Sequence, residues 1–171
     1  MSFFSIKHDE KIKNPIKIEG FNSNRRVVFS KEELEQINDM TTLYFECGED
    51  GVMQDFYTYP IYLVSAKMKK VIQSYEENVI FKPCSLTNIT HDMHEMYYLM
   101  IVSKIDCISD KTEYSHDRIK KLVIDGQKTK DRRIFEISTR LNTYLIVTLD
   151  LAESILRRDA QGLIWDEIEF V

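Results

Sequence analysis

The chain has 171 residues, of which 43% are hydrophobic and 30% are charged, and its formal net charge is −5. These proportions supply enough apolar side chains for a core beneath a well-solvated surface, which favours a single domain over residues 1–171. No run approaches the length of a membrane span, and an acidic chain is a poor candidate for direct nucleic-acid binding, because phosphate contacts need clustered Lys and Arg.

The first 24 residues place short apolar groups among Lys and Asn, which predicts an N-terminal arm with one edge strand. They lack the pattern of a signal peptide. Cys47, Cys84 and Cys107 are odd in number and widely spaced, which argues against a disulfide framework and a Cys-based zinc site. We therefore expect a cytoplasmic protein with no membrane association.

A strand is expected over residues 25–29 and a helix over residues 30–40. Ser30 and Glu33 have the spacing of a capping box, in which each side chain satisfies a backbone amide of the other residue. This is the most clearly marked helix start in the chain.

Negative charge is concentrated in and after this helix. Residues 31–55 hold Lys31 against eight carboxylates, a net charge of −7. Helix capping accounts only for Glu32 and Glu33. The segment is either a solvated surface or a negative patch that attracts a basic partner protein. The candidate partner-binding residues are Glu32, Glu33, Glu35, Asp39, Glu46, Glu49, Asp50 and Asp55.

The middle of the chain predicts mainly strands. Residues 42–47 favour a strand, and residues 55–64 an edge or irregular strand interrupted by Pro60. A loop is expected over residues 87–95. Residues 96–109 then begin with apolar side chains on both faces, which predicts a central strand.

Two segments share a strand, helix and strand pattern. The first covers residues 61–86, where Ser65 is the expected cap of the helix. The second covers residues 143–171, with a strand over residues 143–148, Thr148 as the expected cap and a helix over residues 149–158. Ser65, Met68 and Ile72 align with Thr148, Leu151 and Ile155 at one constant offset, which suggests an internal duplication. Strands over residues 121–124 and 133–137 lie between the units, and Asp125-Gly126 predicts a hairpin with a long loop between those strands. Together the elements predict an α+β fold with a largely antiparallel sheet and two or three helices.

Few residues suggest catalysis. His91 and His94 are the only histidine pair at ligand-like spacing, and no third ligand is obvious beyond Asp92 or Glu95. They are either surface histidines or part of a small metal-dependent hydrolase. Neither a Gly-rich phosphate loop nor a nucleophile-elbow Ser is present, so we expect no enzyme and no cofactor.

A basic segment leaves one further alternative open, a nucleic-acid-associated regulator. The competing interpretation is that these cations are ordinary surface charges on a loop. Its basic residues are Arg118, Lys120, Lys121, Lys128, Lys130, Arg132 and Arg133.

The order of motifs over residues 59–171 resembles a known group. The motifs are Val64-Ser65-Ala-Lys-Met68, Phe81-Lys-Pro83, Tyr97-Tyr-Leu-Met-Ile-Val102, Asp106-Cys107, Ile134-Phe-Glu-Ile137 and Gly162-Leu-Ile-Trp-x-x-Ile-x-Phe170. They resemble the bacterial immunity proteins of polymorphic toxin systems, a family formerly described as a domain of unknown function.

The resemblance implies a small cytoplasmic protein without catalysis. It would bind and neutralise the C-terminal toxic domain of a cognate effector, delivered by contact-dependent inhibition or a related secretion route. Many such toxins are basic nucleases, which an acidic inhibitor could block by occupying the cleft that holds phosphate.

Overall fold

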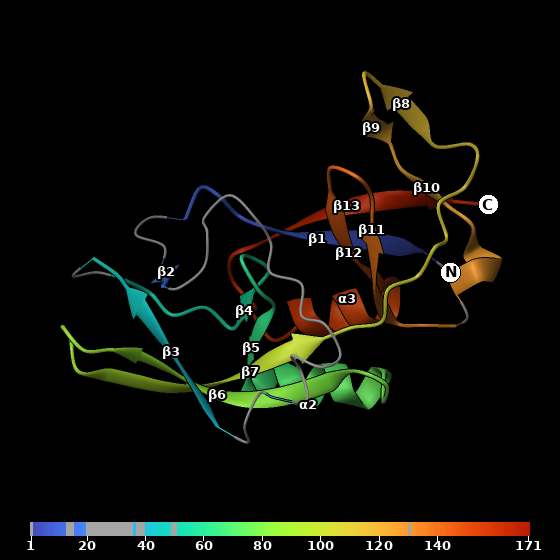
Figure 1. Cartoon of the computed structure of the whole chain (residues 1–171). Coiled ribbons are helices and arrows are strands. Elements are labelled where there is room, and N and C mark those ends of the chain that lie inside the picture. Colours follow the sequence, from blue (N-terminus) through green and yellow to red (C-terminus); the bar gives the residue numbers. More distant parts are fainter. Residues whose placement is uncertain (1, 13–15, 20–35, 37–39, 49–50, 130) are drawn as a thin grey trace.

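The computed structural model describes residues 2–12, 16–19, 36, 40–48, 51–129 and 131–171. Within these ranges the chain is mainly β-structure, and the two α-helices whose ends are both described are short (Figure 1). The strands are β1 (Phe3–His8), β2 (Lys17–Ile18), β3 (Thr41–Glu46), β4 (Phe56–Tyr57), β5 (Leu63–Ser65), β6 (Ile80–Asn88), β7 (Met93–Ile101), β8 (Glu113–Ser115), β9 (Arg118–Lys121), β10 (Val123–Ile124), β11 (Ile134–Ser138), β12 (Thr143–Thr148) and β13 (Leu163–Phe170). The helices are α2 (Ala66–Tyr75), α3 (Leu149–Leu156) and the 3-10 helix η1 (Gly126–Thr129).

The strands form two main sheets and one separate hairpin. The five-stranded sheet has the order β10-β13-β1-β12-β11, and the six-stranded sheet has the order β2-β3-β6-β7-β5-β4. Strands β8 and β9 pair only with each other and project from the body of the molecule (Figure 1).

Both helices join parallel strands that are separated by one antiparallel strand. In the five-stranded sheet, β12 and β13 flank β1, and each is antiparallel to it. In the six-stranded sheet, β5 and β6 flank β7 in the same way. The segments β5-α2-β6 and β12-α3-β13 therefore share a topology, in which the middle strand comes from elsewhere in the chain.

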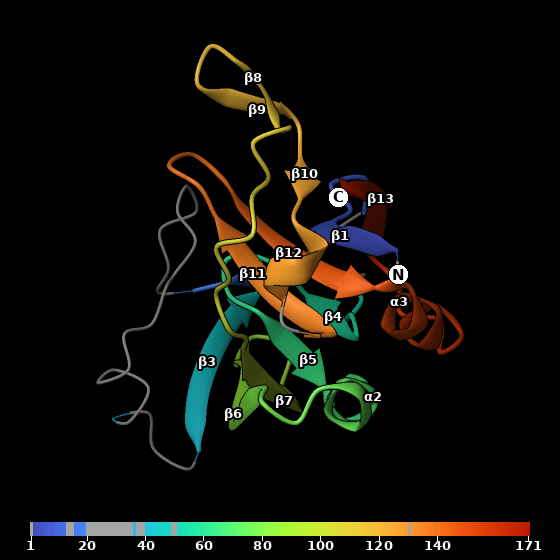
Figure 2. The ribbon, with the colours of Figure 1, turned by 90° about the vertical axis from the view of Figure 1, so that its right-hand side faces the viewer.

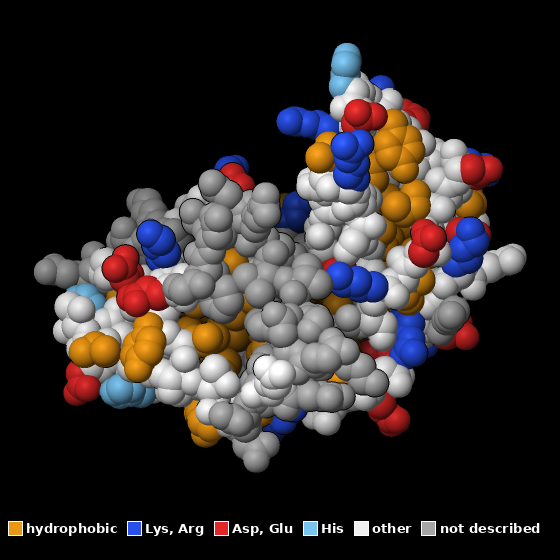
Figure 3. Space-filling model, in the orientation of Figure 1, with side chains coloured by type: hydrophobic (Ala, Val, Ile, Leu, Met, Phe, Trp, Pro, Cys, Tyr) orange, Lys and Arg blue, Asp and Glu red, His pale blue; other side chains and the backbone are white. Residues whose placement is uncertain are grey.

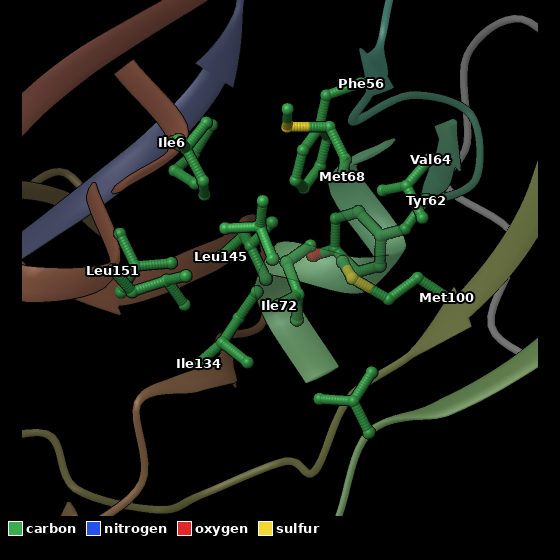
Figure 4. Close-up of a cluster of buried hydrophobic side chains, with 14 of the residues drawn as sticks. Ile6, Phe56, Tyr62, Val64, Met68, Ile72, Met100, Ile134, Leu145 and Leu151 are labelled. Atoms are coloured by element: carbon green, nitrogen blue, oxygen red, sulfur yellow. The ribbon is translucent and has the colours of Figure 1, made fainter. Parts of the chain in front are cut away.

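The two helices lie on the same side of the molecule and contact each other (Figure 2). Their apolar faces enter one core together with side chains from both main sheets (Figure 4). Met68 and Ile72 of α2 and Leu151 and Ile155 of α3 are completely buried there. The helices are thus fixed by tertiary packing, which short helices need for stability.

The helix starts differ in one detail. Ser65 precedes α2 and its hydroxyl accepts a hydrogen bond from the Met68 amide at 3.3 Å, as expected of an N-cap. Thr148 precedes α3 without a side-chain cap bond, and its hydroxyl instead donates to Asp150. The sequence-based expectation that Thr148 caps the first turn is therefore wrong.

The expected fold class needs correction. An α+β fold with one largely antiparallel sheet and two or three helices was predicted, whereas the described chain is mainly β and forms curled mixed sheets with two short α-helices. Strand β3 runs parallel to β6, and β10 runs parallel to β13. The strand order of a sheet cannot be inferred from adjacency in the sequence, which is why these long-range parallel pairs were not foreseen.

Three local expectations also change. Residues 1–24 were expected to hold one edge strand, and β2 does stand at the end of the strand order of the six-stranded sheet. Phe3–His8, however, is a central strand between β12 and β13, which was not expected. Strand β10 pairs with β13 and not with β11, so the predicted hairpin does not form. Most of the loop expected over residues 87–95 belongs to the β6–β7 hairpin. The strand predicted over residues 25–29 lies outside the described residues, as does nearly all of the helix predicted over residues 30–40.

Candidate binding surface

Only part of the predicted acidic surface lies in the described chain. Glu46 and Asp55 are described, whereas the other six candidates fall outside the described residues. Those six are Glu32, Glu33, Glu35, Asp39, Glu49 and Asp50.

Asp55 is engaged locally at the start of α2. Its carboxylate accepts a 2.7 Å hydrogen bond from the Ser65 hydroxyl, and the Lys67 ammonium forms an ion pair with it. Its backbone oxygen accepts a further bond from the Ser65 amide at 2.9 Å. Asp55 therefore holds the N-cap residue of α2 in place, and only part of its side chain faces solvent.

Glu46 is exposed at the end of β3, where it lies opposite Lys17 of β2 in the strand register. Glu19, the residue that follows β2, donates its backbone amide to the Tyr44 carbonyl at 2.8 Å and extends this pairing. The two carboxylates therefore reach the surface on adjacent chain segments beside Tyr44.

Glu46 and Glu19 line an open groove of about 560 Å³ at the end of the six-stranded sheet. Its other lining residues are Tyr44, Phe45, Cys47, Thr87, Asn88, Ile89, Thr90 and His91. Figure 3 shows hydrophobic, acidic and histidine side chains gathered at this left-hand end of the molecule. The groove combines negative charge with exposed apolar surface.

Asn88 shapes the loop at one wall of the groove. Its side-chain oxygen accepts a hydrogen bond from the His91 amide at 2.9 Å, and its amide group donates to the Cys47 thiol at 3.4 Å. These contacts turn the loop between β6 and β7, and they leave Ile89 77% exposed. Ile89 therefore adds an exposed apolar side chain to the same groove that Tyr44 lines.

The histidine pair does not converge on a metal site. His94 Nδ1 lies 3.3 Å from the Thr87 hydroxyl, and its Nε2 lies 3.4 Å from an Asp92 carboxylate oxygen. His91 is exposed on the neighbouring loop. Across the described ranges, no three His, Cys, Asp or Glu side chains are grouped to hold a metal ion.

The basic segment is divided between separate places. Arg118, Lys120 and Lys121 lie on the projecting hairpin and are exposed. Arg132 instead forms a 2.9 Å ion pair with Glu76, and Arg133 lies 3.4 Å from Asp150. Lys128 lies 3.6 Å from Asp125, and Lys130 is outside the described residues. The described cations of this segment therefore do not form one continuous patch.

Sequence reasoning missed the apolar half of the groove. Tyr44 alternates with buried strand residues and Ile89 stands alone in a polar loop, so neither stood out. The available signal was Ile89 itself, because a single large apolar residue between Asn88 and Thr90 has no strand or helix periodicity to bury it.

The comparisons with known proteins give one family. A search of curated proteins found no match. No helix in the described ranges is long and apolar enough to cross a membrane. The model of the Immunity protein family (Imm11) matches residues 3–169, which extends the resemblance over residues 59–171 to nearly the whole chain. The match includes the central strand β1 and the groove, and the chain belongs to the Imm11 immunity protein family.

Proposed function

We propose that this immunity protein neutralises one cognate toxin by binding its C-terminal toxic domain. The toxin is a nuclease, delivered by contact-dependent inhibition or a related route, and the immunity protein acts on it in the cytoplasm of the producing cell. Neutralisation is by tight 1:1 binding, with no reaction performed by the immunity protein.

The observation that supports this proposal most strongly is the chemistry of the groove. Glu19 and Glu46 are exposed beside Tyr44 and Ile89. Nuclease clefts carry Lys and Arg that bind phosphate, so carboxylates held on a sheet match their charge. Exposed aromatic and aliphatic side chains supply the apolar contact area that binding energy requires.

The remaining acidic candidates contribute mainly to the rate of association. Long-range attraction between a negative segment and a basic partner accelerates encounter, and this effect weakens with salt. The residues proposed for it are Glu32, Glu33, Glu35, Asp39, Glu49 and Asp50. Asp55 is not assigned to the contact, because its carboxylate holds Ser65 at the start of α2 and so supports the fold.

The test uses the toxic domain encoded by the adjoining effector gene, with its active site inactivated. Reversing Glu32, Glu33 and Glu35 to Lys should slow association about tenfold at low salt, and the difference should shrink at high salt. The control reverses Glu153, Glu167 and Glu169, three exposed carboxylates on α3 and β13. Unchanged association kinetics at low salt would remove the acidic segment from the proposal.

A further inference from the structure

The outward face of β3, β6 and β7 carries two neighbouring rows of side chains near the hairpin tip. In one row Tyr44 pairs with Thr87, and Thr87 pairs with His94. In the next row Thr42 pairs with Ser85, and Ser85 pairs with Met96. Directly paired residues point to the same face of a sheet, so these six side chains share one surface. We call this the distal sheet surface.

Helix α2 covers the same face farther from the tip. The Lys69 ammonium lies 4.2 Å from the centre of the Tyr98 ring and 5.9 Å from that of Phe81. Met100 is buried in the core that Met68 of α2 also enters. In Figure 1 the β6–β7 hairpin continues to the left past α2. The helix therefore seals one half of the face, and the strands extend beyond it.

The half beyond α2 is exposed although it carries large side chains. Tyr44 is 45% exposed and Met96 is 43% exposed, and His94 is also exposed. Between them Thr42 is exposed and Ser85 is half-buried, whereas Thr87 is buried beneath its neighbours. Aromatic side chains and Met are enriched at the centres of protein interfaces. The distal sheet surface also continues into the groove, since Tyr44 and Thr87 belong to both.

We propose that the distal sheet surface and the adjoining groove are the docking site for the toxin domain. This inference rests on the proposed function and assigns its contact surface. The partner segment is basic and carries an apolar side chain, which inserts between Tyr44 and Ile89. Its Lys or Arg residues face Glu19 and Glu46, whose charges make the rim of the groove negative.

The first experiment measures the dissociation constant of the inactivated toxin domain for paired variants. Tyr44→Ala with Ile89→Asp should weaken binding about tenfold or more, because both residues would lie at the centre of the contact. The matched control is Tyr114→Ala with Leu141→Asp, which changes an exposed Tyr and an exposed Leu elsewhere. The control should stay within about threefold of the wild type.

Two further arms keep the test decisive if a variant folds poorly. The single variant Ile89→Asp changes a loop residue that is 77% exposed, so it should leave the melting temperature unchanged. The wild type also offers a native reporter, since Cys47 lines the groove. Cys84 and Cys107 are buried. Maleimide labelling of Cys47 should slow about tenfold in the complex if the toxin domain covers the groove.

The possible outcomes distinguish a wrong docking site from a wrong proposed function. If the wild type binds the toxin domain but the paired Tyr44 and Ile89 variant binds equally well, the docking site is wrong while the immunity function stands. Equally fast Cys47 labelling in the complex also overturns the docking site. If the wild type neither binds nor inhibits the domain, the proposed function and the docking site both fail.

Discussion

Glu76 accepts a hydrogen bond from the Arg132 guanidinium at 2.9 Å, and this contact ties the end of α2 to the segment before β11. The same carboxylate accepts the Arg133 amide at 3.0 Å and the Asn78 side-chain amide at 2.9 Å. Glu76 is almost fully buried. One acidic side chain therefore links the six-stranded sheet region to the five-stranded one.

Removing this carboxylate should destabilise the whole fold. Glu76→Ala leaves the partly buried Arg132 and the Arg133 amide without their acceptor, so we expect a loss of about 3 kcal/mol in the free energy of unfolding. Urea denaturation measures the loss. The control is Glu77→Ala, which changes the adjacent exposed carboxylate and should cost less than about 0.5 kcal/mol. Equal losses for the two variants would contradict the role assigned to Glu76.

The same site predicts how stability depends on pH. Burial raises the pKa of Glu76, but hydrogen bonds from Asn78, Arg133 and Arg132 outweigh burial and hold the pKa below its ordinary value of 4.5. A lowered pKa in the folded state means that its contribution is present above pH 4.5 and is lost as the pH falls through the folded-state pKa.

The pH prediction is tested by comparing the wild type with Glu76→Gln. The difference in unfolding free energy should be constant between pH 6 and pH 7, about two units above the ordinary glutamate pKa, and should shrink below pH 4.5. A difference that grows on acidification would show that the pKa is raised instead.

Equivalent positions on the two helices should have equivalent effects. Ile72 of α2 and Ile155 of α3 are both fully buried in the shared core. Ile72→Ala and Ile155→Ala should each cost about 2–5 kcal/mol, because each leaves a cavity between the two main sheets.

The shared core also predicts that the sheets unfold together. Denaturation followed by Trp165 fluorescence and by far-ultraviolet circular dichroism should give one coincident transition for the wild type and both variants. Trp165 packs against the shared core from β13, so its emission reports on that core. Two separate transitions would instead divide the chain into independently folding parts.

Substitution of Asp55 should lower stability, whereas substitution of Glu46 should weaken binding of the toxin domain. Asp55→Ala removes the group that accepts from the Ser65 hydroxyl and pairs with Lys67, so it should lower the unfolding free energy by about 1 kcal/mol. Toxin affinity should then stay close to that of the wild type. Glu46→Lys should leave stability unchanged and weaken binding. The reverse pattern would place Asp55, and not Glu46, at the interface.

Local elements with strong periodicity were predictable from the sequence. The strand over residues 143–148 agrees with β12, and the helix that follows it agrees with α3 apart from its last residues. Alternating β-branched residues and a regularly spaced apolar stripe fix such elements through short-range geometry. The first unit was predicted for the same reason, including Ser65 as the N-cap of α2.

Long-range pairing was not predictable, and this affected the candidate site most. The position of β1 between β12 and β13 depends on contacts across almost the whole chain. The charge count identified Glu46, but the pairing of Thr87 with both Tyr44 and His94 is what creates the distal sheet surface. Composition also could not show that the Asp55 carboxylate is engaged by Ser65 and Lys67.

The stoichiometry of toxin inhibition tests most directly whether the protein acts by binding alone. Residual activity of a fixed, micromolar amount of the active toxin domain is measured while the immunity protein is titrated against it. Activity should fall linearly and reach zero at one immunity protein per toxin domain, and it should return when the complex is denatured and the toxin is refolded alone. Complete loss of activity at a small fraction of one equivalent, without recovery of the refolded toxin, would show that the immunity protein acts catalytically and would contradict inhibition by binding.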